Sequence, residues 1–235
     1  MIRLDKLLAD AGTGTRSQVK EYIRRGQVMV NGAVCKKPEH KVTEEDLVCM
    51  NGQTVGYTRF RYYMLHKPPG VVTATEDSRD RTVLDLLTGI NTAHISPVGR
   101  LDKDTEGLLL LTNDGELAHR LLSPKRHVDK CYLVRTEKPL SEADLRALET
   151  GVDIGDEKST LPAKACLSPD GELLLTIQEG RYHQVKRMLQ AVGNQVVYLK
   201  RLSFGSLRLP EDLEIGQFRP LTKEEQERLQ HDVAK

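Results

Sequence analysis

The segment GRLDKDTEGLLLLTNDG, residues 99–115, places a polar loop directly before a run of four leucines. The run is short and apolar, and it lies between Gly107 and the turn signal Asn113-Asp114-Gly115. This pattern predicts a buried β-strand. Because a loop next to a buried strand has a rigid support, we expect Asp102, in that loop, to be the central functional residue.

The acidic side chains of this loop also match part of a calcium-binding pattern. Asp102, Asp104, Glu106 and Gly107 occupy its positions one, three, five and six. Position twelve is Asn113 where the pattern has a bidentate glutamate, and a leucine strand stands where it has a helix. Calcium binding and a solvated acidic turn are the alternatives to a catalytic loop.

Composition indicates a globular protein with one sizeable core and a small accessory domain. The 235 residues are 38% hydrophobic and 29% charged. Neither a basic-then-apolar leader nor a long apolar run occurs, so we expect a cytoplasmic protein that does not contact membranes. The four cysteines form no Cys-x-x-Cys pair, so we expect neither a disulfide framework nor a zinc site.

The net charge of +1 hides a local excess of positive charge at the N-terminus. Residues 1–41 carry nine Lys or Arg against four Asp or Glu. Leucines 4, 7 and 8 have helical spacing, and a capping box of Thr15 with Gln18 predicts the start of a second helix that ends at Gly26. The dipeptide Asn31-Gly32 between alternating valines predicts a β-hairpin. This part therefore reads as two helices followed by a hairpin.

The rest of the chain alternates predicted strands and helices. We expect a strand at 62–65 that is broken at His66 and resumes at 71–75, because prolines cannot donate to a central ladder. Further strands are expected at 132–135, 163–167, 173–177 and 196–202. Helices are expected at 82–87, at 115–122, from Ser141 to Gly151 and from Thr222 onward. This mixture favours an α+β fold with a mainly antiparallel sheet and peripheral helices.

Four motifs, the Asp102 loop among them, occur in an order found in a known enzyme family. They are residues 99–102 with 105–109, 130–132, 179–188 and 199–205. Together they resemble the signature of RsuA-type pseudouridine synthases, the branch that includes RluB, RluE and RluF. Residues 3–32 resemble the S4 RNA-binding module. The resemblance implies an S4-like domain at 1–58 and a catalytic domain with a mixed sheet at 59–235.

The resemblance also implies a reaction, the isomerisation of a specific uridine in ribosomal RNA to pseudouridine without a cofactor or metal. Asp102 would be the catalytic carboxylate and Lys186 the cation that keeps it ionised. Tyr132 would stack on the flipped uracil, and Arg100 would fill the space that the base leaves. Base-pocket residues would be Val185 and Leu199. Without the resemblance, Tyr132, Val185 and Leu199 would be interpreted as core residues.

The S4-like module implies ribosomal RNA as the partner, free or within a pre-ribosomal particle, and we expect a monomer. Arg16, Lys20 and Arg24 share one helix face because they recur every four residues. The side chains expected to contact RNA are Arg3, Lys6, Arg16, Lys20, Arg24 and Arg25. Residues 179–188 and the short C-terminal end resemble the branch of the family that acts on small-subunit ribosomal RNA, which is therefore the expected substrate. Large-subunit RNA, a non-catalytic RNA-binding protein, and a hydrolase that uses the acidic cluster remain alternatives.

Overall fold

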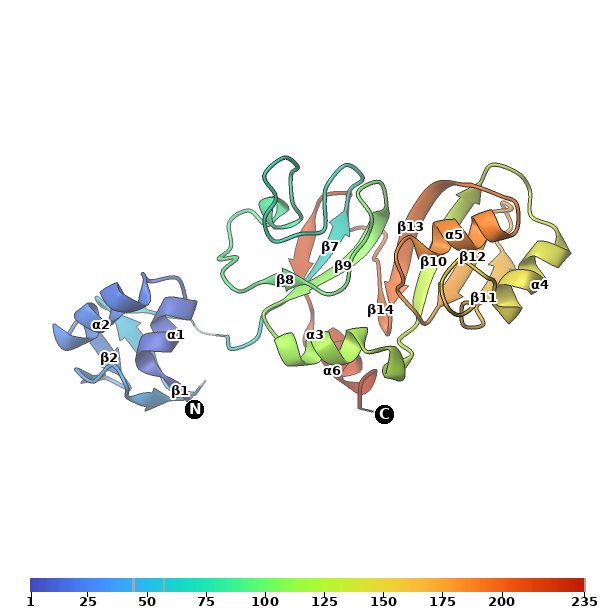
Figure 1. Cartoon of the computed structure of the whole chain (residues 1–235). Helices are drawn as coiled ribbons and strands as arrows, with labels where there is room; N and C mark the ends of the chain where they lie inside the picture. The colour runs from blue at the N-terminus through green and yellow to red at the C-terminus, as the bar shows by residue number, and fades with distance from the viewer. Residues whose placement is uncertain (44, 57, 235) are drawn as a thin grey trace. The chain divides into compact units, whose positions relative to one another are not determined.

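The computed structural model of the protein describes residues 1–43, 45–56 and 58–234 (Figure 1). Backbone contacts divide the chain into two compact units. The first unit comprises Met1–Arg61 together with Gly89–His94, and the second comprises Tyr62–Thr88 and Ile95–Lys235. Residues 89–94 lie with the first unit, where the Asn91 amide donates to the carbonyl of Asp10 at 3.1 Å.

The first unit packs two helices against small sheets around an aliphatic core. Its helices are α1 (Leu4–Asp10) and α2 (Arg16–Arg24). A four-stranded sheet has the order β3-β2-β5-β6, with β2 (Val28–Val30), β3 (Ala33–Val34), β5 (Val48–Met50) and β6 (Gln53–Thr54), and a separate pair joins β1 (Ile2–Arg3) to β4 (Lys41–Val42). The buried core consists of leucines from α1, Val19 and Ile23 from α2, and valines from the strands.

Two local predictions for the first unit are confirmed. Thr15 and Gln18 form the capping box that begins α2, each side chain bonding to the other's backbone amide. Asn31 and Gly32 have φ angles of 51° and 80°, and they connect β2 to β3. Positive φ at both central residues is what a two-residue type I′ hairpin requires.

The second unit is built on one nine-stranded mixed sheet. The main order is β11-β12-β10-β13-β9-β7-β15, while β14 pairs with β13 and β8 with β9. The strands are β7 (Tyr62–Lys67), β8 (Ser96–Pro97), β9 (Glu106–Thr112), β10 (Lys130–Thr136), β11 (Lys164–Leu167), β12 (Leu173–Ile177), β13 (Val196–Phe204), β14 (Leu207–Arg208) and β15 (Phe218–Pro220). The leucine run 108–111 is completely buried in β9, as predicted.

Four helices accompany this sheet. They are α3 (Gly115–Leu122), α4 (Glu142–Thr150), α5 (Gln184–Ala191) and α6 (Lys223–His231). Figure 1 shows α4 and α5 beside the strands β10 to β13. The predicted cap at Ser141 is present, because its side chain accepts a hydrogen bond from the amide of Asp144. The predicted α+β fold with a mixed, mainly antiparallel sheet is confirmed. No helix of the described residues is long and apolar enough to span a membrane.

The order of strands makes β9 and β13 the seam of the sheet. They pair in parallel through Glu106 with Lys200 and Gly107 with Arg201, whereas the other strand pairs are antiparallel. At Gly107, φ is 118°, and a Cβ atom would lie 2.3 Å from the carbonyl oxygen of Arg201. Only glycine allows so close an approach of the two backbones.

Three predictions for residues 62–87 are wrong in detail. Strand β7 continues through His66 to Lys67, because Lys67 still pairs with Gly107 and the chain leaves the sheet only at the prolines. Residues 71–75 form no second strand; only Val72 makes an isolated bridge, and Thr73 bonds to Leu101 instead. The helix expected at 82–87 is a single 3-10 turn, η1 (Leu84–Leu86).

Replacing Gly107 by alanine should weaken the seam. The added methyl group would overlap the backbone of Arg201, so we expect the free energy of unfolding to fall by about 3 kcal/mol. Gly115→Ala is the matched control, since nothing lies within 4 Å of a Cβ at that position. Urea unfolding of both variants measures the difference. Equal midpoints for Gly107→Ala and the wild type would contradict the close approach.

Candidate active site

Asp102 lies in the loop that precedes β9, here called the Asp102 loop (residues 99–105), and it faces two basic side chains. One carboxylate oxygen is 3.1 Å from the ammonium of Lys186, and the other is 3.6 Å from Nε2 of His183. The Asp102 side chain is 28% exposed, so it is accessible from outside while partly shielded. The predicted pairing of Asp102 with Lys186 is therefore present in the structure, although the two residues are 84 positions apart in the sequence.

Lys186 also binds a second carboxylate, which sequence analysis did not pair with it. Its ammonium lies 2.7 and 2.9 Å from the two carboxylate oxygens of Asp104. Burial lowers the pKa of Lys186, but hydrogen bonds to Asp104 and Asp102 outweigh burial and raise it. Burial raises the pKa of Asp104, but the hydrogen bond and charge of Lys186 outweigh burial and lower this pKa. Lys186 is thus held in its cationic form beside Asp102.

A small pocket brings together every residue predicted for the catalytic site. Its lining includes Arg100, Asp102, Tyr132, Val185, Lys186 and Leu199. Tyr132 from β10 and Leu199 from β13 are 8% and 6% exposed, and Val185 lies buried near the start of α5. An apolar wall therefore lies next to a carboxylate held by a cation. Arg100 lines this pocket and is exposed to solvent.

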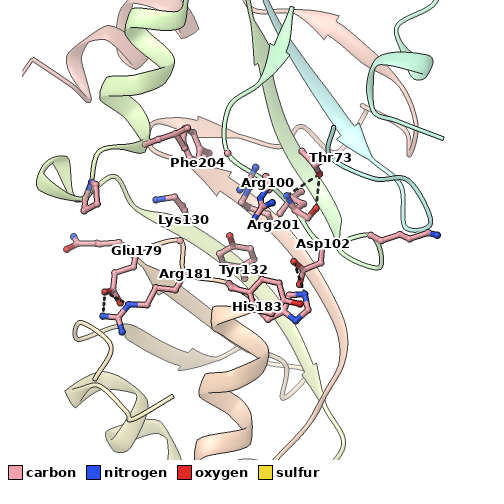
Figure 2. A pocket seen from close by; sticks show the side chains of 18 of the residues that line it. Thr73, Arg100, Asp102, Lys130, Tyr132, Glu179, Arg181, His183, Arg201 and Phe204 are labelled. Atoms are coloured by element: carbon pink, nitrogen blue, oxygen red, sulfur yellow. Dashed lines mark hydrogen bonds and ion pairs between the residues drawn. The ribbon is translucent and has the colours of Figure 1, made fainter. Parts of the chain in front are cut away.

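A larger cavity of about 710 Å³ adjoins the small pocket and shares part of its wall (Figure 2). The two have Arg100, Leu101, Asp102, Tyr132, Gly180, Arg181 and His183 in common. Lys130, Arg201 and Phe204 line only the larger cavity. Figure 2 shows Phe204 and Lys130 toward one end and Asp102 with His183 toward the other, with Tyr132 between them.

The chain matches the family described as RNA pseudouridylate synthase over residues 61–191, and it matches the S4 domain over residues 2–48. The first match spans more than half of the chain and contains Asp102, Tyr132 and Lys186. The chain belongs to the RNA pseudouridylate synthase family. It is an RsuA-type pseudouridine synthase with an S4 domain, as the motifs predicted.

Three curated relatives match this chain over nearly the full length of both proteins. "Uncharacterized RNA pseudouridine synthase YtzG" of Bacillus subtilis is 51% identical, over 95% of this chain and 96% of that protein. "Ribosomal small subunit pseudouridine synthase A" of Vibrio cholerae is 41% identical, over 95% and 97%. "Ribosomal large subunit pseudouridine synthase B" of Bacillus subtilis is 42% identical, over 97% and 96%.

A solved structure supports the same assignment. It is described as "Crystal structure of pseudouridylate synthase" and has 40% sequence identity with this chain. The match covers 97% of this chain and 100% of the other, with a TM-score of 0.69. The similarity thus extends beyond the catalytic unit of this pseudouridine synthase to both of its units.

A buried lysine, Lys67, supports the Asp102 loop of this synthase and was not predicted from the sequence. The Lys67 side chain has no exposed surface. Its ammonium lies 2.9–3.4 Å from the carbonyl oxygens of Pro68, Asp102, Lys103 and Thr105. Burial lowers the pKa of Lys67 to about 8, against the raising effect of Asp104 and Asp102. Its position before Pro-Pro-Gly, at the end of an apolar strand, was the available signal.

A second network fixes the loop between β12 and α5, which carries His183. The Arg181 guanidinium bonds to the Glu179 carboxylate at 2.6 and 3.0 Å and to the carbonyls of Lys158 and Ser159. The other Glu179 oxygen accepts from the Gln184 amide at 2.9 Å. Much of the 179–188 motif is thus explained by loop geometry, which holds Lys186 opposite Asp102.

Glu106 has a structural role that does not fit a calcium loop. Its carboxylate accepts from His66 and Tyr198, each at 2.9 Å, and pairs with Lys200 at 3.0 Å. Burial raises the pKa of Glu106, but these partners outweigh it and lower the pKa. In the described part of the chain, no group of three or more His, Cys, Asp or Glu side chains could hold a metal ion.

The six basic residues expected to contact RNA lie in the first unit, but only some have free charges. Arg3 bonds to the buried Asp5 through two contacts of 3.0 Å, and Arg16 lies 3.5 Å from the same carboxylate. Arg25 pairs with Glu21. The remaining three, Lys6, Lys20 and Arg24, form no ion pair among the described residues. The pairing of Asp5 with Arg3 and Arg16 was not predicted.

Removing the ammonium of Lys67 should disturb the Asp102 loop. In Lys67→Met, buried carbonyls lose their donor, so we expect the free energy of unfolding to fall by about 3 kcal/mol. A displaced Asp102 should slow single-turnover pseudouridine formation about a hundredfold. Lys103→Met is the control, because Lys103 is exposed and its ion pair with Asp80 contributes less than about 1 kcal/mol. Equal losses in both variants would contradict the support role.

Proposed function

We propose that this pseudouridine synthase isomerises one uridine of small-subunit ribosomal RNA, with Asp102 as the catalytic carboxylate. The observation that carries the proposal is the ion pair of Asp102 with Lys186 beside a pocket walled by Tyr132, Val185 and Leu199. The reaction breaks the bond from N1 of uracil to C1′ of ribose and joins C1′ to C5. N1 gains a proton and C5 loses one, so the mass of the RNA does not change.

The charges of the site fit this chemistry. A carboxylate can attack as a nucleophile or stabilise the electron-poor sugar carbon as the bond to the base breaks. In a partly dry pocket it needs a cation nearby to stay ionised, and Lys186 at 3.1 Å provides it. Since the lysine ammonium is a compact point charge and not a planar fork, it can contact Asp102 and Asp104 at the same time.

The pocket can admit a uracil only after the base has left its stack. Extrusion of a stacked base costs a few kcal/mol. Arg100, an exposed residue of the pocket lining, is the residue proposed to occupy the vacated space. Tyr132 offers an aromatic face inside the pocket, on which the flipped base would stack.

The S4 domain is proposed to add affinity for ribosomal RNA, free or within an assembling subunit. Lys20 and Arg24 on α2, together with Lys6, carry charges that no carboxylate neutralises among the described residues. They would contact phosphates, whereas Arg3 and Arg16 are held by Asp5. Phosphate contacts position the RNA and do not read its sequence.

Small-subunit RNA is favoured by the name of the Vibrio cholerae relative and by the 179–188 motif. Large-subunit RNA is the second candidate, because a Bacillus subtilis relative of similar identity is named for that substrate. Mapping pseudouridines in both ribosomal RNAs from cells with and without this protein separates the two. We expect one small-subunit site to disappear. Loss of a large-subunit site would overturn the choice of substrate but not the reaction.

Replacing the Asp102 carboxylate should abolish the reaction and leave RNA binding intact. For Asp102→Asn we expect at least a thousandfold loss of rate, because the amide cannot act as a nucleophile. The control is Asp80→Asn, a half-buried residue outside the small pocket. Primer extension after chemical labelling detects pseudouridine as a stop, and filter binding measures affinity. Full activity of Asp102→Asn would contradict the assignment.

The same experiment separates the two alternatives. A non-catalytic RNA-binding protein would bind the RNA, and the wild type would produce no labelling stop. A hydrolase that uses Asp102 and Asp104 with a divalent ion would change the mass of the RNA and would be inhibited by a chelator. We expect an unchanged mass and activity in the presence of a chelator.

A further inference from the structure

Two buried cations, Lys130 and Arg201, line the larger cavity (Figure 2). Arg201 is 2% exposed and Lys130 is 8% exposed. The register of β10 and β13 puts Lys130 opposite Phe204 and Tyr132 opposite Arg201. The ring of Phe204 lies 5.5 Å from the Lys130 ammonium and 5.3 Å from the Arg201 guanidinium carbon. The two charges therefore flank one aromatic ring in the same cavity.

Neither cation forms an ion pair with a carboxylate of the described residues. Lys130 donates to the carbonyl of Val128 at 2.9 Å, and Nε of Arg201 donates to that of Leu108 at 2.8 Å. Nη2 of Arg201 is buried without a hydrogen-bond partner in the described part of the chain. Asp129 is the acidic group that acts on Lys130, but its carboxylate binds Gln178 and Lys164.

This arrangement is costly for the free protein. Burying a charge without a counter-ion is unfavourable, and two like charges near each other add to the cost. Burial and the neighbouring Arg201 lower the pKa of Lys130 to about 8. An anion with several oxygen acceptors would use the spare donors of both side chains and neutralise their charges. A phosphate group has this chemistry, whereas an uncharged base does not.

The position of the two cations in the larger cavity indicates which phosphate of the RNA they would bind. Tyr132 lines both cavities, so an RNA whose uracil enters the small pocket must carry its backbone through or past the larger one. Lys130 and Tyr132 are two positions apart on β10 and both line the larger cavity (Figure 2). The phosphate nearest in sequence to the flipped base is therefore the one within reach.

We propose that Lys130 and Arg201 bind a phosphodiester group directly next to the target uridine, and so draw the flipped nucleotide into the cavity. The proposal rests on the proposed function, since it assumes that the uracil occupies the small pocket. It assigns binding to two residues outside the Asp102–Lys186 pair. Binding through a buried anion site would give affinity specifically to the extruded nucleotide, unlike phosphate contacts on an exposed helix.

The test uses a small-subunit RNA hairpin that contains the mapped uridine, made with one uncharged methylphosphonate linkage. The linkage lies on the 5′ side of the uridine, on the 3′ side, or four nucleotides away as a control. For the wild type, we expect affinity to fall about tenfold at one adjacent linkage and not at the distant one. Equal affinity for all linkages would overturn the proposal, whatever the variants do.

Lys130→Met supplies the second half of the test. Its affinity for the charged RNA should fall about tenfold, and the neutral linkage that weakens the wild type should cause no further loss. If the two losses multiply, Lys130 does not contact that phosphate, and the proposal is wrong. Lys164→Met, which replaces an exposed lysine on β11, is the control. Its affinity should fall about tenfold at the neutral linkage, just as the affinity of the wild type does.

These binding results are independent of catalysis. If the wild type produces no pseudouridine in the charged RNA, the proposed function fails, while the methylphosphonate series still shows whether a phosphate is bound. If pseudouridine forms but neither adjacent linkage changes affinity, the reaction stands and the phosphate site falls. Thermal unfolding of Lys130→Met checks that it folds; the wild-type series decides the matter if it does not.

Discussion

The seam between β9 and β13 is the constraint on which the candidate active site depends. Two backbone positions, Gly107 against Arg201 and Glu106 against Lys200, join the two sides of the sheet in parallel. The Asp102 loop enters β9 at this seam, and β13 carries Leu199 and Arg201 across it. Because the backbones touch there, a shift of either strand would move Asp102 relative to its pocket. Buried hydrogen bonds of Glu106 and Lys67 stabilise this same region at the start of β9.

Features of the fold that depend on neighbouring residues could be predicted from the sequence. The turn at Asn31-Gly32 and the cap at Thr15 follow from local backbone chemistry, and the leucine run was correctly identified as a buried strand. Residues 71–75 were predicted to form a strand because their β-branched side chains favour one, and this prediction was wrong. Thr73 instead bonds to the Asp102 loop, a tertiary contact that overrides local propensity.

The site divides in the same way. Asp102, Tyr132 and Lys186 lie in motifs, so resemblance located them, and the structure brings them together around one pocket. Lys67 lies outside the motifs, and Arg201 lies within the motif 199–205 but was assigned no role, because lysine and arginine are mostly surface residues. Their burial becomes visible only when strand register places them beside the Asp102 loop and the larger cavity. Asp5 is the corresponding case in the S4 domain, where it forms ion pairs with two arginines that were expected to contact RNA.

Charge distribution explains how an almost neutral protein can handle a polyanion. Surface cations of the S4 domain act at a distance and are screened by salt, whereas the cations near the pocket are shielded from water and act at short range. In the pocket each has a distinct environment. Lys186 is balanced by Asp102 and Asp104 and is held as a cation, while Lys130 is unbalanced and has a lowered pKa. In our proposals, the lysine paired with carboxylates keeps the reacting carboxylate ionised, and the lysine without a counter-ion binds the backbone of the RNA.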